Sequence, residues 1–480
     1  MMLQKHLAKY FTPVLVAVWA IAFFGYLGWK PGFAYNAQRY FEILLIGSLL
    51  CAGITLPVRF YLGRFWTIAS FPLLGIMLVV IWQADNSWPA IREGMQYLAL
   101  FGALLVVAKA RHHVGAESFD RAALMGVLVF CFGCSLIVLE GLVLSISIGL
   151  VDQRIVFGAF VNIRIFAELQ FLTLLLMPAA HYQLRTAGWR TFVALTAVLW
   201  WGLLLYSGTR SALIALPFAV LVVGLTGGAN TLGWFRTIGL QFLGGLFFYA
   251  LLRGMVSAVL GTPFWGGGGG MSFARASTSG RLDLWYDSWR HFLESPWLGQ
   301  GPGAFACFTD QLVAGPHNLF FQLLAEWGGL LTALSFGLAL VIFCALVKNI
   351  RRFEAPGPLH FSLFATLVTA VVASMMQGMI NSPLQQMLIV LVFGWTLHLF
   401  SRSKFVSESE NSVRPSQILH LVAVIVFLSI LLWGVKKDLQ LQRELLVSPD
   451  GTVNLSYGPR FWADGHDHCP DWHERYKKRN

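Results

Sequence analysis

Apolar runs of about 20 residues recur along most of the chain, separated by short polar segments. A helix of that length spans the hydrocarbon core of a bilayer, so each run predicts one membrane helix. Several runs are short or closely linked, and the pattern therefore predicts about 12 or 13 spans. The expected spans are residues 11–29, 41–58, 66–82, 95–108, 122–147, 165–182, 191–206, 212–226, 237–256, 329–347, 361–380, 386–400 and 418–435.

One long segment, residues 257–328, contains no apolar run that could cross a bilayer. It separates about nine N-terminal spans in residues 1–256 from the C-terminal spans in residues 329–435, and a short polar tail, residues 436–480, follows them. No internal repeat is visible in the sequence. The pattern predicts an all-α polytopic membrane protein whose helices hold one large loop, and this loop is expected to carry short interfacial helices.

The composition agrees with this architecture. Of the 480 residues, 57% are hydrophobic and 12% are charged, about half the charged fraction of an average soluble domain. The net charge of +11 does not indicate a nucleic-acid partner, because Lys and Arg in a polytopic protein first mark the cytoplasmic ends of its helices. Lys348, Arg351 and Arg352 follow the span after the large loop, so the loop and the tail are expected in the periplasm.

Motifs of soluble catalytic sites are absent from the sequence. There is no phosphate-binding glycine loop and no H-E-x-x-H zinc motif, and the glycine run 266–270 follows no strand. The six cysteines show no spacing typical of a disulfide framework.

Arg164, Arg210 and Arg281 lie on the loop side of the membrane, where topology does not require positive charge. Arg210 occupies a turn of a few residues between two apolar helices. A guanidinium at that depth is costly unless it faces a cavity or an anion, and snorkelling to lipid headgroups is the alternative interpretation. Glu168 follows Arg164 by one helical turn and is either a functional carboxylate or an ion-pair partner for an arginine.

Residues 282–294 carry apolar side chains at helical spacing, which predicts a short amphipathic helix lying at the membrane interface. Ser279 is the expected N-cap of this helix. Arg281 then falls in the first turn, beside free backbone N–H groups. An arginine at a helix N-terminus is a favourable site for phosphate oxygens.

His317 follows Pro316 and opens the next helical pattern. The start of a helix disfavours an imidazolium, so His317 is expected to be mainly neutral near pH 7. A neutral imidazole can accept a proton or donate a hydrogen bond. A histidine that merely caps the turn is the alternative.

Four sequence motifs together resemble the O-antigen ligase and polymerase superfamily, which comprises bacterial inner-membrane glycosyltransferases of the GT-C type. They are the turn G-T-R-S-A at 208–212, S-G-R-x-x-x-W at 279–285, W-L-G-x-G-P-G-x-F at 297–305 and P-H-N-x-x-x-x-x-L-A-E-W-G at 316–328. The motif resemblance covers about residues 164–330, and the hydropathy layout extends it over nearly the whole chain. The turn departs from the family pattern, which often has serine before the arginine and glycine after it.

The resemblance implies a donor in which a glycan is linked to a polyprenyl diphosphate such as undecaprenyl diphosphate. Ligases of the superfamily use the lipid A–core of lipopolysaccharide as acceptor, polymerases a growing glycan, and O-oligosaccharyltransferases a Ser or Thr of a pilin or other protein. A ligase-type enzyme is our first expectation. It is expected in the bacterial inner membrane, with its active site facing the periplasm and without a nucleic-acid partner.

By the same resemblance, Arg210 and Arg281 match the family's diphosphate-binding arginines, Arg164 matches less closely, and His317 matches its essential histidine. Fixed cations would stabilise the leaving diphosphate, and His317 would take the proton of the attacking hydroxyl or else bind the diphosphate. Direct displacement would invert the anomeric configuration, and the resemblance implies no cofactor, no metal ion and no nucleotide sugar. The expected supporting residues are Asn318, Glu326 and Asp283, of which the two carboxylates are the alternative bases.

A transporter that moves a lipid-linked glycan without chemistry is the alternative from a different class. Such a protein is expected to show paired, similarly interrupted helices in its two halves. No such symmetry is visible in the sequence.

Overall fold

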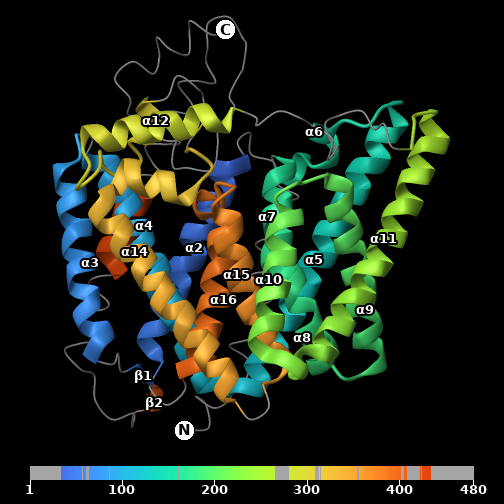
Figure 1. Ribbon diagram of the computed structural model, residues 1–480, viewed down its shortest axis with the longest axis horizontal. Coiled ribbons are helices and arrows are strands. Elements are labelled where there is room, and N and C mark those ends of the chain that lie inside the picture. Colours follow the sequence, from blue (N-terminus) through green and yellow to red (C-terminus); the bar gives the residue numbers. More distant parts are fainter. Residues whose placement is uncertain are drawn as a thin grey trace, which may run out of the picture.

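The computed structural model describes residues 34–56, 58–60, 64–85, 87–160, 162–264, 280–308, 313, 315–353, 356–401, 405–407, 422 and 424–433. Most helices run side by side along one direction, and α12 (Arg281–Glu294) lies across one end of them (Figure 1). At the other end, β1 (Val58–Phe60) and β2 (Phe405–Ser407) form a short antiparallel pair. The chain is an all-α polytopic membrane protein, as the hydropathy pattern predicts.

The other helices are α2 (Ala34–Thr55), α3 (Arg64–Gln83), α4 (Ser87–Val114), α5 (Ala116–Ser147), α6 (Gln153–Val156), α7 (Ile163–Thr173), α8 (Met177–Gln183), α9 (Ala187–Ser207), α10 (Ala212–Gly227), α11 (Leu232–Leu260), α13 (Phe305–Phe308), α14 (Leu319–Arg352), α15 (Pro358–Ser374) and α16 (Pro383–Ser401). Short 3-10 turns lie at η1 (Gly158–Phe160), η2 (Leu174–Leu176), η3 (Gly228–Thr231) and η4 (Met379–Asn381).

Within the described residues, seven helical stretches are long and apolar enough to cross a membrane, with α7–α8 and α10–α11 each taken as one stretch. Shorter apolar helices cover Phe71–Gln83, Pro358–Ser374 and Val424–Trp433. The expected span at 11–29 and the polar tail lie outside the described residues. The total of about 12 or 13 spans therefore remains a prediction.

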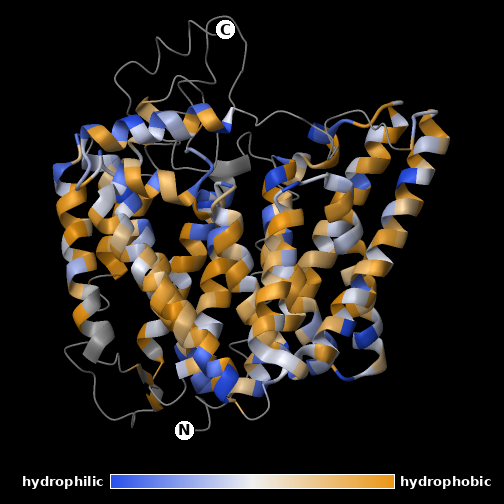
Figure 2. Ribbon diagram, viewed as in Figure 1, coloured by the Kyte–Doolittle hydropathy of each residue, from blue (hydrophilic) through white to orange (hydrophobic). Residues whose placement is uncertain are grey.

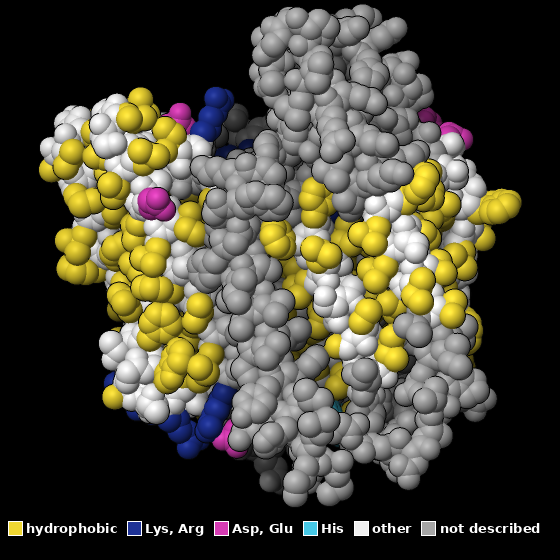
Figure 3. Space-filling view, turned by 180° about the vertical axis from the view of Figure 1, so that it is seen from behind, with side chains coloured by type: hydrophobic (Ala, Val, Ile, Leu, Met, Phe, Trp, Pro, Cys, Tyr) yellow, Lys and Arg dark blue, Asp and Glu magenta, His cyan; other side chains and the backbone are white. Residues whose placement is uncertain are grey.

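An apolar belt surrounds the bundle, as expected of a surface that faces lipid. Hydrophobic residues dominate the middle of the helices, while hydrophilic residues gather at their ends and along α12 (Figure 2). From behind, hydrophobic side chains dominate the described parts of the face at mid-height, and charged side chains lie mostly toward its upper and lower edges (Figure 3). Leu221, Leu225 and Phe247 are among the large apolar side chains exposed on this belt.

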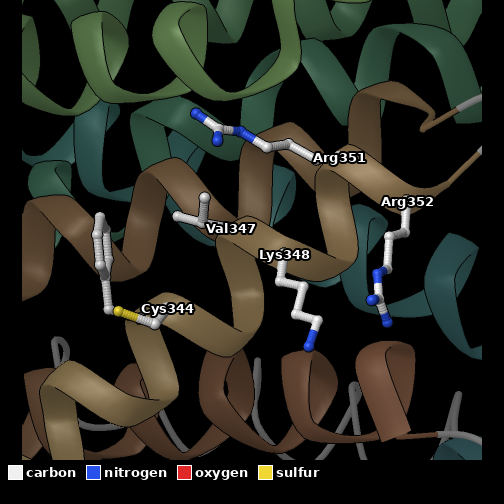
Figure 4. Close-up of a pocket in the computed structure, with 6 residues that line it drawn as sticks. Cys344, Val347, Lys348, Arg351 and Arg352 are labelled. Carbon is white, nitrogen blue, oxygen red and sulfur yellow. The ribbon is translucent and has the colours of Figure 1, made fainter.

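The end of α14 remote from α12 carries the basic residues that predict the cytoplasmic side. A shallow pocket of about 420 Å³ is lined there by side chains of this one helix, among them Phe343, Cys344 and Val347. Lys348 and Arg352 extend in the same direction, and Arg351 extends away from them (Figure 4). The polar heads therefore spread around the end of the helix, as is typical of residues that anchor a span at the cytoplasmic face.

Two local details differ from the sequence analysis. The expected amphipathic helix is present as α12, but its N-cap is Gly280, with φ 71°, and Ser279 lies outside the described residues. A backbone in the left-handed region suits glycine, which explains why the residue before Arg281 lacks a side chain. Cys307 in α13 is disulfide-bonded, which the cysteine spacing did not indicate.

Candidate functional site

Arg164 lies in the first turn of α7, at the end of the bundle that α12 crosses. The side-chain Oδ1 of Asn162, the N-cap residue, accepts a hydrogen bond from the Arg164 backbone N–H at 2.8 Å. Glu168 lies one turn further on and is buried, and the Ser382 hydroxyl donates to its Oε2 at 3.4 Å. A cation and an anion therefore share the same face of this helix start.

Arg210 lies in the tight turn between α9 and α10. The turn begins at Gly208, whose φ is 63°, and the hydroxyls of Ser207 and Thr209 lie 2.9 Å apart in a hydrogen bond. Ser211 accepts a hydrogen bond from the Gln377 side-chain amide at 2.7 Å. These bonds fix the backbone of the turn, while the Arg210 side chain itself is exposed and can reach a ligand.

Arg281 is the first residue of α12, and its Nε–H is buried without a hydrogen-bond partner among the described residues. Burial lowers the pKa of Arg281. The positive charges of Arg164 and Arg210 lower this pKa further, and the negative charge of Glu168 raises it. Arg164 and Arg210, which stand on separate elements, therefore both lie within electrostatic range of Arg281, and so does the acidic Glu168. We call Arg164, Arg210 and Arg281 the arginine cluster.

The start of α12 is fastened to the turn before α14. The Trp285 indole N–H donates to the Pro316 carbonyl at 3.1 Å, and the Trp285 ring stacks on Phe321 with 5.5 Å between ring centroids. This contact brings Arg281 and His317 together although 35 residues separate them in the sequence. Trp285 thus has an inward structural role that its position in an amphipathic pattern does not reveal.

His317 has a φ of 52°, and no other non-glycine residue among those described has a positive φ. Such a backbone costs of the order of 1–3 kcal/mol and persists where surrounding contacts enforce it. Burial lowers the pKa of His317 to about 4, and the nearby charges of Arg164 and Arg281 contribute. The imidazole is therefore neutral near pH 7, as predicted, although burial and the arginines account for this rather than the helix terminus alone.

Asn318 holds His317 in place from the next position. Its Oδ1 accepts from the Phe321 backbone N–H at 3.2 Å, which caps α14, and its amide N–H donates to the Met375 carbonyl at 2.8 Å. Met375 belongs to residues 375–382, which join α15 to α16 and which we call the α15–α16 connection. Asn318 therefore links the histidine turn to a distant part of the chain.

Glu326 lies in the packing between two of the sequence motifs. It is fully buried, and it accepts hydrogen bonds from the Phe305 backbone N–H at 3.2 Å and the Gln322 amide at 3.3 Å. The backbones touch here: a Cβ on Gly328 (φ 74°) would lie 2.4 Å from the Trp297 carbonyl oxygen. The glycine-rich loop 297–305 is thus fastened to α14 through Glu326, which gives this carboxylate a supporting position.

Asp283, the other expected supporting residue, is exposed in the first turn of α12. An acidic residue there stabilises the helix N-terminus. The charges that act on the pKa of His317 and of Arg281 are those of the arginines and Glu168. The structure thus brings together Arg164, Arg210, Arg281 and His317, with Asn318 and Glu326 holding the surrounding backbone.

The α15–α16 connection was missed in the sequence. Gln377, Gly378 and Ser382 lie against the elements that carry the arginine cluster and His317. The sequence signal was weak. It was the short stretch Q-G-M-I-N-S at 377–382, on the loop side of the membrane, whose last two residues lie between two expected spans. Such a stretch is also typical of an ordinary connection between two spans.

A family model described as O-antigen ligase matches residues 195–336. The matched segment begins within α9 and ends within α14, and it includes Arg210, Arg281 and His317. The resemblance to the O-antigen ligase superfamily is thereby confirmed over this segment. Arg164 and the α15–α16 connection lie outside it. No curated protein matches the chain.

Proposed function

We propose that the chain is a membrane glycosyltransferase that transfers a glycan from a polyprenyl diphosphate to an acceptor at the periplasmic face. The observation that carries this proposal is the convergence of the arginine cluster and a neutral His317 at one end of the bundle. The family match supports an enzyme of the ligase and polymerase type. A donor with a diphosphate is the ligand whose charge fits the three guanidinium groups.

The arginine cluster favours an anion for two reasons. Three fixed cations repel one another in a partly buried site, and bound phosphate oxygens relieve that repulsion. In addition, negative charge grows on the diphosphate as its bond to the anomeric carbon breaks, and cations already in place stabilise it without reorganisation. This is the charge stabilisation that a divalent metal can otherwise supply, so we propose a metal-independent reaction.

His317 is the proposed proton acceptor. The acceptor hydroxyl oxygen forms a bond to the anomeric carbon, the bond from that carbon to the phosphate oxygen breaks, and the hydroxyl proton passes to the imidazole. Because the attacking and leaving oxygens lie on opposite faces of the carbon, the anomeric configuration inverts. The donor also raises the basicity of His317, since its negative charge offsets the field of Arg164 and Arg281.

We place the enzyme in the bacterial inner membrane with this site in the periplasm. The disulfide of Cys307, in α13 directly after the glycine-rich loop, supports this location because disulfides persist in oxidising compartments. Lipid A–core is the proposed acceptor. A pilin or a growing glycan would use the same donor site, so the acceptor has to be assigned by experiment.

The test is transfer by purified protein in proteoliposomes that contain a polyprenyl-diphosphate glycan and no nucleotide. Lipid A–core, a pilin and a free glycan are offered in parallel, and the products are separated by mass. We expect transfer to lipid A–core. Transfer to the pilin or the free glycan instead would move the enzyme to another branch of the superfamily, and movement of the donor across the bilayer without transfer would show a transporter.

A further inference from the structure

The α15–α16 connection contacts three of the four parts of the chain that carry a residue of the proposed site: the turn before α14, the turn between α9 and α10, and α7. Its Met375 carbonyl accepts from Asn318, beside His317, and its Gln377 side chain donates to Ser211, beside Arg210. Its Ser382 hydroxyl donates to Glu168, one turn from Arg164. The position of this short connection therefore sets the relative positions of three separate parts of the site.

Gly378 brings the connection directly against the histidine. A Cβ at this position would lie 3.3 Å from the His317 Nδ1, tighter than ordinary van der Waals contact. The backbone of Gly378 has a φ of −81°, which any residue can adopt. A side chain at this position would press on the imidazole, so the glycine matters here for space rather than for its conformation.

Arg39 on α2 also anchors the connection. Its Nη2–H donates to the Asn381 carbonyl at 2.7 Å, and its Nη1–H donates to the Gln386 side-chain oxygen and pairs with Glu42. Gln386 in turn donates to the Ile380 carbonyl at 2.6 Å. The buried guanidinium of Arg39 thus holds the end of the connection directly, at Asn381, and indirectly, through Gln386. Arg39 and Asn381 are 342 positions apart in the sequence.

Asn381 in turn connects to α14 through its side chain. Its side-chain amide and that of Gln322 exchange two hydrogen bonds, at 3.1 and 3.2 Å. Gln322 lies just over one helical turn after His317, on the helix that Asn318 caps. A continuous path of hydrogen bonds therefore runs from Arg39 to the turn that carries the histidine.

We propose that Arg39 is a positioning residue, which acts through the α15–α16 connection to place His317 against the arginine cluster. The expected effect of Arg39 on the rate rests on the proposed function, whereas its effect on the position of His317 does not. Charged hydrogen bonds in a low-dielectric interior are strong and directional, so they can fix a turn to a fraction of an ångström. A misplacement of about 1 Å at a reacting group can cost about 100-fold in rate.

A buried arginine can also serve stability alone, and the chain offers a matched control. Arg111, near the end of α4 remote from the site, is as buried as Arg39 and bonds Asp120 at 2.7 and 2.9 Å. Asp120 accepts in turn from Trp395 of α16, so Arg111 joins helices as Arg39 does. Loss of Arg111 removes comparable interactions but leaves the α15–α16 connection untouched.

The test compares Arg39→Lys, Gln386→Met and Arg111→Lys in purified full-length protein. Lysine retains a charge for Glu42 but cannot bridge Gln386 and the Asn381 carbonyl together, and methionine loosens the same connection without leaving a buried charge. We expect kcat per folded molecule to fall about 10- to 100-fold in both connection variants, with donor KM changed less than about threefold. Arg111→Lys is expected to keep its kcat.

Hydrogen exchange of residues 317–322 and 375–382 gives a second readout that needs no activity. Both connection variants should exchange faster there than wild type, and Arg111→Lys should not. Unchanged exchange in the connection variants would overturn the proposal whether or not the wild type transfers glycan. A kcat in Arg39→Lys equal to that of Arg111→Lys would overturn its kinetic part, while a wild type inactive on every acceptor would count against the proposed function instead.

Discussion

If His317 accepts the proton of the attacking hydroxyl, the rate of transfer should follow the protonation state of its imidazole. In the free protein, burial and the charges of Arg164 and Arg281 lower the pKa of His317 from 6.5 to about 4. That difference corresponds to roughly 3 kcal/mol against the imidazolium. An imidazole accepts a proton only above its pKa, so kcat/KM should rise with pH through an acid limb near pH 4.

The donor complex should behave differently. A bound diphosphate brings negative charge next to the same two arginines, so it offsets part of their effect and raises the pKa of His317. Burial is the largest of the three causes and remains when the donor is bound. The acid limb of kcat should therefore lie above that of kcat/KM but still below the ordinary value of 6.5.

The assay is the initial rate of glycan transfer in proteoliposomes between about pH 3.5 and 8, at donor concentrations below and above KM. Samples returned to pH 7 after each exposure control for inactivation by acid. His317→Gln is the matched variant, and its residual rate should show no such limb. An acid limb of kcat/KM at 6.5 or above, or the same limb in His317→Gln, would refute the reasoning.

Further predictions concern the donor site, the loop packing and the topology. Arg210→Lys and Arg281→Lys should reduce transfer strongly, because lysine loses bidentate contact with phosphate, and the alanine variants should abolish transfer at normal membrane levels. Wild-type rates in both alanine variants would show that Arg210 and Arg281 only anchor the protein to lipid. Gly328→Ala should unfold at a lower temperature than Gly337→Ala. The added Cβ at Gly328 would meet the Trp297 carbonyl on a backbone with positive φ, whereas the one at Gly337 would meet nothing within 4 Å. Equal melting temperatures would contradict this packing. Reporters fused within residues 265–279 should be periplasmic and those fused directly after residue 352 cytoplasmic, and the reverse result would exclude the proposed site.

The fold class and the amphipathic helix α12 could be predicted because both depend on local patterns. Apolar runs of spanning length and a 3.6-residue period need no knowledge of distant contacts. Details that depend on one backbone angle could not be predicted, and the N-cap at Gly280 instead of Ser279 is an example. The disulfide of Cys307 was missed for a similar reason, since cysteine spacing carries no information on distant pairing.

The candidate site could be predicted in part. Arg210, Arg281 and His317 were identified through motifs, and the structure places Arg281 within electrostatic range of both Arg210 and His317. The sequence did not reveal the residues that hold them there. Arg39 resembles a snorkelling arginine near a helix end, and only the fold shows that it bonds to the Asn381 carbonyl.

The most direct test of the account is donor binding and turnover measured separately for His317→Gln in purified protein with a polyprenyl-diphosphate glycan. Glutamine can donate a hydrogen bond but cannot take a proton at neutral pH. The account predicts donor binding close to that of wild type and a turnover lowered by about 10²- to 10⁴-fold. Turnover near the wild-type rate, or a loss confined to donor binding, would contradict the role of His317 as the base.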